Sequence, residues 1–344
     1  MPSRVGVCPP PGRLLNTGAV RELAVVIVSH NSASWLEPCL RSLYAHAGGV
    51  KLDVVVVDNE SSDGSAELVE REFVGARVVR SANRGFAYGN NRGLESVSAP
   101  FVLLLNPDTE IVEGTFGELL DRMEADPRLG LAGCRQLNSA GTVHPTIRRF
   151  PSATRCLFQA LGSERYPVRA SWLGERELDP LAYERETPCD WTSGSFMLAR
   201  SEAIAAVGGM DERYFLYCEE PDLCLRLRRD GWQVRHLPSM TILHAARGSA
   251  PRSERLVAQE AYARRQYLSK NVTGVRRHMI LFALVLGHLM RALSAGAGED
   301  RTSRRAASSA AIRALLGLSP PPFATVLDTP QADAAPAVDA LVGN

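Results

Sequence analysis

The sequence lacks the features that mark secreted, zinc-binding or disulfide-rich proteins. It contains seven cysteines, an odd number, and no two of them stand at C-x-x-C spacing. This usage argues against a disulfide framework or a zinc knuckle and fits a reducing compartment. The Pro/Gly-rich residues 1–22 lack the apolar run of about 7–15 residues found in secretory signals. We therefore expect a cytoplasmic protein with a flexible leader over residues 1–22.

Long apolar runs and a charge excess are also lacking. The longest apolar run, residues 279–290, is interrupted by His288 and is shorter than the roughly 20 residues that span a bilayer. Lys and Arg total 39 while Asp and Glu total 38, which argues against a nucleic-acid-binding protein held mainly by electrostatic attraction. What is present is a globular composition, with 45% apolar and 22% charged residues, able to bury a sizeable core.

A strand pattern recurs four times in the first third of the chain. Continuous runs of Val, Ile and Leu, without polar alternation, are typical of strands that are covered on both faces. Helical patterns separate these runs, and strand–helix–strand repetition predicts an α/β fold with a parallel sheet and right-handed crossovers. The four predicted strands are residues 23–29, 52–58, 76–81 and 101–106.

The later part of the chain has a different character. Residues 136–247 have mixed patterns, residues 248–295 look helical, and residues 296–344 form a low-complexity tail with a short helix predicted at 306–316. Residues 251–313 contain 12 basic and 4 acidic residues around the apolar run. Two interpretations stay open for this segment. It lies in an anionic membrane interface, or it is a helix packed on the domain.

Polar residues follow the predicted strands at their carboxyl ends. Ligands of open parallel sheets bind beyond these ends, where neighbouring strands terminate at one edge. We therefore expect the strand ends to bring a set of candidate binding residues together: Ser29, Asn31, Asp58, Asn59, Asn83, Gly85, Asn106 and Asp108.

Two acids in this set point to specific chemistry. Asp58, after four valines, either contacts a base or ribose or serves as a turn residue. Asp108, in an Asn-Pro-Asp-Thr segment, either closes an Asx turn or is a hard oxygen ligand for Mg²⁺ or Mn²⁺. If the ligand is a diphosphate, each pair of a carboxylate and a phosphate repels by about 4 kcal/mol at about 4 Å and an effective dielectric of about 20. A divalent cation reverses that sign, so a phosphate site lined by acids implies a metal.

Glycines recur every fourth residue at Gly85, Gly89 and Gly93. This spacing is not the G-x-G-x-x-G pattern of dinucleotide-binding proteins, which argues against a dehydrogenase. It places the glycines on one helix face, where they allow close packing of the helix on the sheet. Alternatively, the amides of this segment reach a nucleotide or phosphate.

An acidic segment begins a helical pattern in the second half. Pro221 suits the first position of a helix and disfavours the α region for Glu220, so Glu220 should face outward at the start of the helix. We predict Glu220 as the general base, with Glu219 orienting it or binding the acceptor. Asp222 stands four residues before Arg226, so an ion pair and a helix-dipole interaction explain it, although it remains a second candidate for the base.

Further candidates lie on either side of this helix. His244 ends an apolar stretch and is either structural or a partner of a metal or phosphate. Trp191 either stacks on a sugar or packs in the core, and Gly194 allows a ligand close to the backbone. Ser195 has no evident partners for a Ser-His-Asp arrangement, which argues against a hydrolase.

Six segments, taken in order, resemble inverting family-2 glycosyltransferases and most of all their bacterial rhamnosyltransferase-like branch. They are VVIVSHNS, VVVVDNESSDGS, NRGFAYGNNRG, FVLLLNPDT, residues 190–232 and the final LH. The resemblance covers residues 23–247. It implies a GT-A fold, in which a Rossmann-like, mostly parallel sheet is flanked by helices, followed here by the C-terminal helical extension over residues 248–295.

The resemblance also implies roles for the candidate residues. Residues 23–135 would bind the nucleotide sugar and residues 136–247 the acceptor, with the strand-end residues contacting the donor. Asp108 corresponds to the last acid of the D-x-D-type motif that binds metal and diphosphate, and Asn106 stands at its first position. Glu220 corresponds to the catalytic base and His244 to a histidine near the metal. We place Asp190, Trp191 and Gly194 on the acceptor side.

The predicted function is transfer of a sugar, with L-rhamnose implied by resemblance alone, from a nucleoside-diphosphate donor to a hydroxyl of a cell-envelope glycan or glycolipid. The transfer would proceed with inversion and need Mg²⁺ or Mn²⁺. Expected partners are the nucleotide sugar, a glycan or lipid-linked acceptor, the inner face of the cell membrane and a second copy of the chain, with no nucleic acid. Two alternatives stay open: a non-catalytic sugar-nucleotide-binding subunit and a sugar nucleotidyltransferase.

Overall fold

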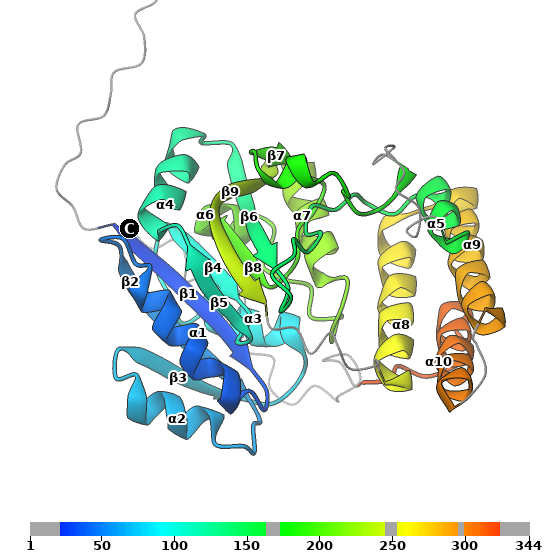
Figure 1. Cartoon of the computed structure of the whole chain (residues 1–344), viewed down its shortest axis with the longest axis horizontal. Coiled ribbons are helices and arrows are strands. Elements are labelled where there is room, and N and C mark those ends of the chain that lie inside the picture. The colour runs from blue at the N-terminus through cyan, green and yellow to red at the C-terminus, as the bar shows by residue number, and fades with distance from the viewer. Residues whose placement is uncertain (1–20, 163–172, 245–252, 295–298, 324–344) are drawn as a thin grey trace, which may run out of the picture.

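The computed structural model describes residues 21–162, 173–244, 253–294 and 299–323, and Figure 1 shows their arrangement. Within these residues a nine-stranded sheet has the strand order β3-β2-β1-β4-β8-β6-β9-β5, and β7 pairs with β9 outside this order. Helices cover both faces of the sheet, and a separate group of helices lies at one side of it. The expected α/β fold class is therefore confirmed.

The first four strands form the parallel part of the sheet, as predicted from their apolar runs. In this part β1 pairs with β2 and β4, and β2 pairs with β3, all in parallel. Three helices make the crossovers between them. The elements are β1 (Glu22–Ser29), α1 (Ala33–Ala45), β2 (Lys51–Asn59), α2 (Ser65–Glu72), β3 (Ala76–Ser81), α3 (Phe86–Leu94) and β4 (Phe101–Leu105).

The second half of the sheet is mixed. Strand β8 pairs antiparallel with both β4 and β6, whereas β6 and β9 are parallel. Strands β5 and β7 each pair antiparallel with β9. The elements are β5 (Thr109–Glu113), α4 (Phe116–Ala125), β6 (Leu129–Leu137), α5 (Ala153–Ala160), the 3₁₀ helix Pro180–Tyr183, β7 (Thr187–Pro188), β8 (Phe196–Arg200), α6 (Ser201–Ala206), α7 (Glu219–Arg229) and β9 (Gln233–His244).

Alternate residues of the central strands feed two cores, one on each face of the sheet. In β1, Val25 and Ile27 pack in one core, while Val26 and Val28 pack in the other. Each of these side chains is buried, which explains why the strands are apolar at every position rather than at every second one.

The glycines of α3 allow this helix to pack closely on the sheet. A Cβ on Gly93 would lie 2.2 Å from a methyl carbon of Val26, and one on Gly89 would lie 2.8 Å from a methyl carbon of Val28. The prediction of close helix–sheet packing is confirmed for these two residues. It is wrong for Gly85, which precedes the helix with a φ of 102° and so does not share its sheet-facing side.

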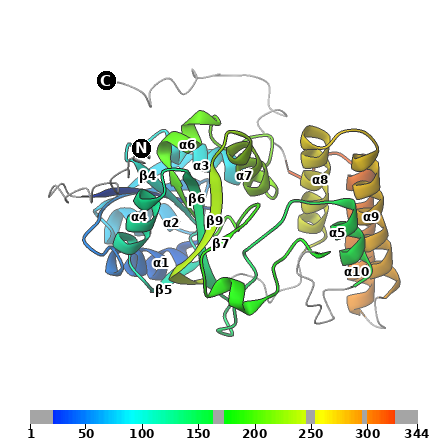
Figure 2. The ribbon, with the colours of Figure 1, turned by 90° about the horizontal axis from the view of Figure 1, so that it is seen from above.

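Three helices follow the sheet: α8 (Glu254–Asn271), α9 (Gly274–Leu293) and α10 (Glu299–Leu316). Figures 1 and 2 show α8 between α7 and α9, with α5 and α10 packed in the same group. The helical extension expected over residues 248–295 thus contains two helices, separated at Val272 and Thr273. The short helix predicted at 306–316 is the C-terminal part of α10. In the part of the chain that is described, no helix has both the length and the apolar character needed to cross a membrane.

Candidate active site

The carboxyl ends of the parallel strands bring the predicted polar residues to one edge of the sheet. Ser29 lies opposite Asp58 in the pairing of β1 with β2, and β4 ends beside Ile27 of β1. Asn31 adopts the left-handed conformation, with a φ of 52°, and its carboxamide oxygen accepts a hydrogen bond from the backbone N–H of Ser62 at 2.8 Å. The loops that follow β1 and β2 are therefore joined at this edge.

Several buried oxygens at this edge have no hydrogen-bond partner among the described residues. They are Ser29 Oγ, Asp58 Oδ1, Asn59 Oδ1 and Asn106 Oδ1. The other carboxylate oxygen of Asp58 accepts a hydrogen bond from the Ser61 N–H at 3.2 Å. Nearly all buried polar groups in proteins form hydrogen bonds. Several buried oxygens without a hydrogen-bond partner are therefore expected at a ligand site rather than in the protein core.

Asn83 and Gly85 shape the loop between β3 and α3. The Asn83 side-chain oxygen accepts a hydrogen bond from the Gly85 N–H at 3.4 Å, and the Asn83 N–H donates to a carboxylate oxygen of Glu60 at 3.1 Å. Asn59 donates from its amide nitrogen to the Gly85 carbonyl at 3.2 Å. These contacts connect the end of β2 to the start of α3 at the same edge of the sheet.

A cavity of about 900 Å³ lies between this edge and the C-terminal helices. Asn106, Asp108, Trp191, Glu220 and His244 line it together, so residues predicted for the metal, the base and the acceptor share one space. The remaining predicted site residues do not line this cavity. They are Ser29, Asn31, Asp58, Asn59, Asn83, Gly85, Asp190, Gly194, Glu219 and Asp222.

A chain of hydrogen bonds fixes the ring of His244 beside Asp108. The Ser195 hydroxyl donates to Gln136 Oε1 at 2.7 Å, and Gln136 Nε2 donates to His244 Nδ1 at 2.7 Å. The proton of the imidazole then lies on Nε2, which donates to Asp108 Oδ1 at 3.1 Å. Ser195, which the sequence excludes as a nucleophile, thus orients the amide that holds the histidine.

The residues around Asp108 fit a cation that binds together with phosphate. Within the described ranges, no group of three or more His, Cys, Asp and Glu side chains could enclose a metal ion. Mg²⁺ commonly takes one or two protein ligands and completes its shell with substrate phosphates and water. Asp108 offers oxygen ligands, and the unpaired Asn106 Oδ1, just after β4, belongs to the same cavity lining. His244 Nε2 would offer a lone pair only if its proton moved to Nδ1 and the Gln136 amide turned its oxygen toward the ring. This donor set suits Mg²⁺ or Mn²⁺.

Glu220 lies in the first turn of α7, and its carboxylate faces the cavity. The Gly194 N–H donates to Glu220 Oε1 at 3.1 Å, and a Cβ on Gly194 would lie only 2.6 Å from the same oxygen. Gly194 therefore positions the Glu220 carboxylate, both by its N–H and by the absence of a side chain. Burial raises the pKa of Glu220, which favours proton acceptance near neutral pH, while the hydrogen bonds to backbone N–H groups and the charge of Arg148 act in the opposite direction.

The position of Pro221 differs from the prediction. The helix begins at Glu219, so Pro221 occupies its third position rather than its first, and Glu220 is helical. The first N–H groups of a helix have no intrahelical acceptor. A proline at the third position therefore loses no hydrogen bond, and the restriction that it places on Glu220 is overcome by the surrounding structure.

The loop before α7 is held in an unusual conformation. Tyr217 and Cys218 have φ values of 73° and 70°, a region that costs energy for residues other than glycine. The Phe86 N–H donates to the Phe215 carbonyl at 2.7 Å, and Gln259 of α8 donates to the Leu216 carbonyl at 3.1 Å. Contacts from α3 and α8 thus fix the loop that presents Glu220.

Glu219 has a different environment from its neighbour. Its side chain is 2% exposed, and Oε2 has no hydrogen-bond partner among the described residues. Burial, and then the adjacent charge of Glu220, raise the pKa of Glu219 well above its usual range. Burial therefore disfavours the charged form of Glu219, and this residue does not line the cavity.

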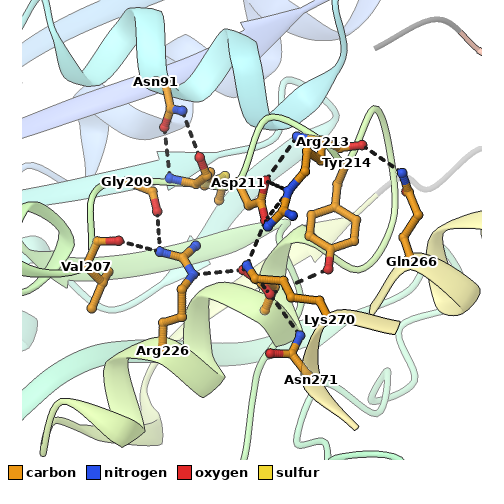
Figure 3. A network of polar contacts seen from close by, with 12 residues as sticks. Asn91, Val207, Gly209, Asp211, Arg213, Tyr214, Arg226, Gln266, Lys270 and Asn271 are labelled. Atoms are coloured by element: carbon orange, nitrogen blue, oxygen red, sulfur yellow. Dashed lines mark hydrogen bonds and ion pairs between the residues drawn. The ribbon is translucent and has the colours of Figure 1, made fainter. Parts of the chain in front are cut away.

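Asp222 is fully buried in a polar network that joins α7 to α8, and Figure 3 shows this network. The predicted ion pair with Arg226 is present at 2.8 Å. Lys270 lies 2.7 Å from the same carboxylate, and Asn271 donates to it at 3.0 Å. Lys270 also contacts Asp211 at 2.7 Å. Neither Asp222 nor its partners Arg226, Lys270 and Asn271 line the cavity.

Trp191 and Asp190 form part of the cavity wall and its support. Trp191 Nε1 donates to the Arg149 carbonyl at 3.1 Å, and the guanidinium of Arg148 lies over its ring, 5.4 Å from the centroid. Asp190 accepts a hydrogen bond from the Phe150 N–H at 2.9 Å and pairs with Arg228 at 3.2 Å. Trp191 lines the cavity, whereas Asp190 stabilises the segment next to it through its contacts with Phe150 and Arg228.

The sequence did not reveal several cavity residues. Most of them come from the irregular segment after β6, Tyr217 comes from the loop before α7 and Arg264 from α8, while Gln136 of β6 holds His244 without lining the cavity. No motif distinguishes these residues, and the only signal was the richness of the region after β6 in Trp and Arg. Burial and two neighbouring arginines, Arg148 and Arg176, lower the pKa of one of them, His144, to about 4. The missed residues are Gln136, His144, Arg148, Glu175, Arg176, Tyr217 and Arg264.

Comparison with known proteins agrees with this geometry. A sequence model described as Glycosyl transferase family 2 matches residues 24–180. An N-acetylglucosaminyl-diphospho-decaprenol L-rhamnosyltransferase of Mycobacterium tuberculosis is 32% identical over 64% of this chain and 75% of its own length. The rhamnosyltransferase WbbL of Escherichia coli is 25% identical over 64% of this chain and 83% of its own length.

A solved structure shares the fold. The mannosyltransferase PcManGT from Pyrobaculum calidifontis, solved in complex with GDP-Man and Mn²⁺, superposes with a TM-score of 0.54. The match covers 88% of this chain and 89% of that one at 17% identity, and so it shows the fold alone. The sequence matches show the family: the chain belongs to glycosyl transferase family 2 and is an inverting glycosyltransferase.

Proposed function

We propose that this protein transfers a sugar, L-rhamnose in the first instance, from a nucleoside-diphosphate donor to a lipid-linked glycan acceptor of the cell envelope. The observation that carries this proposal is the shared cavity, in which the Asp108–His244 pair and the Glu220 carboxylate face one space. The sugar and acceptor follow the names of the two rhamnosyltransferases that the chain resembles. Donor binding belongs to residues 23–135, and acceptor binding and catalysis belong to residues 136–247.

The donor side uses the edge of the parallel strands. The unpaired oxygens of Ser29, Asp58 and Asn59 are acceptors for the hydroxyl and N–H groups of a nucleoside. Asp108 and His244 would hold Mg²⁺ or Mn²⁺ next to the diphosphate. When bound, the cation supplies positive charge that stabilises the departing diphosphate.

The acceptor side centres on Glu220. Its carboxylate takes the proton of the acceptor hydroxyl as that oxygen attacks the anomeric carbon. The hydrogen bond from the Gly194 N–H fixes the direction of the carboxylate, and Trp191 forms part of the wall on the acceptor side. Glu219 is enclosed at the start of α7 and does not line the cavity, so we assign it no proton transfer from the acceptor.

The C-terminal helices complete the acceptor side and offer a contact with the membrane. Leu256, Arg264 and Tyr267 of α8 line the cavity. On α9, large apolar side chains stay exposed at intervals of three, four or seven residues, which places them on one helix face. They are Val275, Met279, Phe282, Leu289 and Leu293. Two arginines lie at the start of α9, Arg276 exposed and Arg277 half-buried, and basic residues beside an apolar face are typical of helices that lie in an anionic interface. We propose peripheral contact with the inner face of the cell membrane.

The test is a panel of nucleoside-diphosphate sugars with Mg²⁺ or Mn²⁺, scored for nucleoside-diphosphate release with and without a lipid extract of bacterial envelope. Release that depends on both the lipid and one donor supports the proposal. Donor binding without release over the whole panel would favour a non-catalytic subunit. Pyrophosphate release from a nucleoside triphosphate would favour a nucleotidyltransferase.

A further inference from the structure

Arg148 is a largely enclosed cation in the cavity wall, and the buried anion whose charge acts on it, Glu175, is itself bound by Arg264 at 3.2 Å. Its Nε has no hydrogen-bond partner, and no carboxylate among the described residues forms an ion pair with its guanidinium. The contact that the structure does give this group is the face of Trp191. Burial, together with the nearby charge of Arg176, lowers the pKa of Arg148 to about 10, so it still carries its charge at neutral pH.

Other arginines of this wall are paired. Arg149, the next residue, contacts Glu177 at 2.5 Å, and Arg264 contacts the buried Glu175 at 3.2 Å. A charge taken out of water without a partner is costly, and buried charges in proteins are nearly always paired. Arg148 therefore shares the charge of Glu175 with Arg264, and among the described residues it has no carboxylate of its own in ion-pair contact.

The backbone holds Arg148 firmly in the cavity wall. The Arg148 N–H donates to the Trp191 carbonyl at 3.1 Å, and the Asp190 N–H donates to the Arg148 carbonyl at 2.9 Å. These bonds place Arg148 on the same wall as Trp191. The charge of Arg148 also acts on the Glu220 carboxylate, lowering its pKa against the effect of burial. Arg148 therefore lies on the acceptor side, close to the group that contacts the attacking hydroxyl.

We propose that the Arg148 guanidinium binds a phosphate group carried by the acceptor, next to the sugar whose hydroxyl Glu220 deprotonates. This inference rests on the proposed function and names the chemical class of its acceptor: a sugar joined through phosphate to an apolar chain. A guanidinium matches phosphate oxygens in a two-pronged arrangement. A sugar ring between Glu220 and Arg148 would place its hydroxyl at the base and its phosphate at the cation. The apolar chain would then extend toward α8 and α9.

The direct test is calorimetric titration of farnesyl diphosphate into the full chain, in the presence of Mg²⁺ and a saturating nucleoside diphosphate. The nucleotide fills the donor site, so the remaining diphosphate site is the one measured. We expect Arg148→Gln to weaken binding by about tenfold or more, the loss that accompanies a charged hydrogen bond, and Arg148→Lys to retain part of it. The matched control is Arg149→Gln, which removes the same charge from the adjacent residue and should bind as wild type does.

Binding that is equal in wild type and Arg148→Gln would overturn the proposal, and so would competition between farnesyl diphosphate and the nucleotide, because the phosphate site would then be the donor's. The titration needs no turnover, so an inactive protein would refute the proposed function without affecting this result. Thermal melting of each variant separates a lost site from a lost fold, and Arg148→Lys carries the test if Arg148→Gln does not fold.

A kinetic arm assigns the phosphate to the acceptor. Two acceptors are compared, with the same N-acetylglucosamine and the same farnesyl chain, joined either through a diphosphate or directly. Wild type should prefer the diphosphate acceptor in kcat/KM, and Arg148→Gln should lose that preference while its KM for the donor stays unchanged. An equal loss on both acceptors, or an increased donor KM, would contradict the assignment.

Discussion

Glu219 and Glu220 are adjacent acids with different surroundings. Glu219 is enclosed and lacks a partner for one oxygen, whereas Glu220 faces the cavity and accepts a hydrogen bond from Gly194. Burial raises the pKa of both, but only Glu220 also has a nearby cation, Arg148, that favours its ionised form. The environment therefore separates a structural carboxylic acid from a carboxylate able to accept a proton.

The raised pKa of Glu220 predicts where activity falls with acid. A general base works only when ionised, so kcat/KM should decrease as the pH falls through the raised pKa, at a higher pH than the ordinary value of 4.5 for glutamate. The pH–rate profile measures this directly. Glu219→Gln should leave the fall in activity at low pH in place, because Glu219 does not line the cavity and burial disfavours its charged form. An acid limb that disappears in Glu219→Gln would instead assign the base to Glu219.

Gly194 offers a test of how the carboxylate is seated. In Gly194→Ala the new methyl group would lie 2.6 Å from Glu220 Oε1 and displace it. We expect kcat to fall by about 100-fold, as small displacements of catalytic groups commonly do, with donor affinity unchanged. Gly75→Ala is the control, because its Cβ would meet only the Tyr44 hydroxyl at 3.6 Å. Normal turnover in Gly194→Ala would mean that Glu220 is not the base.

At the scale of elements, the important contact is the one between α7 and α8. Asp222 of α7 binds Lys270 and Asn271 at the end of α8, and Gln259 near the start of α8 holds the loop before α7. Helix α7, which carries Glu220, and helix α8, which lines the cavity, are therefore joined by contacts near both ends of α8. Figure 3 shows how many groups converge at the first of them.

This contact predicts a loss of stability rather than of chemistry when Asp222 is changed. Asp222→Asn leaves Lys270 and Arg226 without their shared counter-ion, and breaking a buried ion pair in this way costs about 3–5 kcal/mol. Denaturant unfolding measures this loss, and Lys51→Met, which breaks the exposed ion pair with Glu22, should have little effect. If Asp222→Asn is as stable as wild type yet inactive, Asp222 is the base and Glu220 is not.

Local sequence patterns predicted the parallel part of the fold well. The apolar runs of β1, β2 and β4 are buried on both faces, and such runs have few alternatives to a covered parallel strand, whereas β3 at the edge of the sheet is only partly buried. The position of β8 between β4 and β6 was not predictable in this way, because it depends on pairing between residues distant in sequence. Pro221 shows the same limit at one residue, since tertiary contacts around the loop before α7 overrode its local preference.

The candidate site likewise contains residues that local sequence patterns reveal and residues that depend on tertiary contacts. Asp108, Glu220 and His244 could be named from the sequence because each follows or begins a recognisable element and matches a family motif. Arg148 and Arg176 could not, because they line the cavity from an irregular segment that no motif marks. Gln136 could not either, because its importance comes from its contact with His244, which is distant in sequence. Charge and burial at these positions become visible only when the chain is folded.

At the scale of the whole molecule, the apolar face of α9 predicts membrane contact. The Phe282 side chain is 67% exposed, and burying such a side chain is worth about 1.5–3 kcal/mol. Phe282→Asp should therefore weaken binding to vesicles containing phosphatidylglycerol by about tenfold or more, measured by co-sedimentation. Val74→Asp is the control, since Val74 is 90% exposed in the turn before β3, far from α9 in the fold. Equal binding by both variants would show that α9 does not contact lipid.

The most direct measurement compares wild type, Glu220→Gln and Asp108→Asn for donor binding and for sugar transfer under the same conditions. Glu220→Gln should bind the nucleotide sugar as wild type does and transfer it about 100- to 10,000-fold more slowly, the usual contribution of a general base. Asp108→Asn should lose the dependence of donor binding on Mn²⁺ while keeping its fold. Wild-type transfer by Glu220→Gln, or unchanged Mn²⁺ dependence in Asp108→Asn, would contradict a mechanism in which these two carboxylates face each other across one cavity.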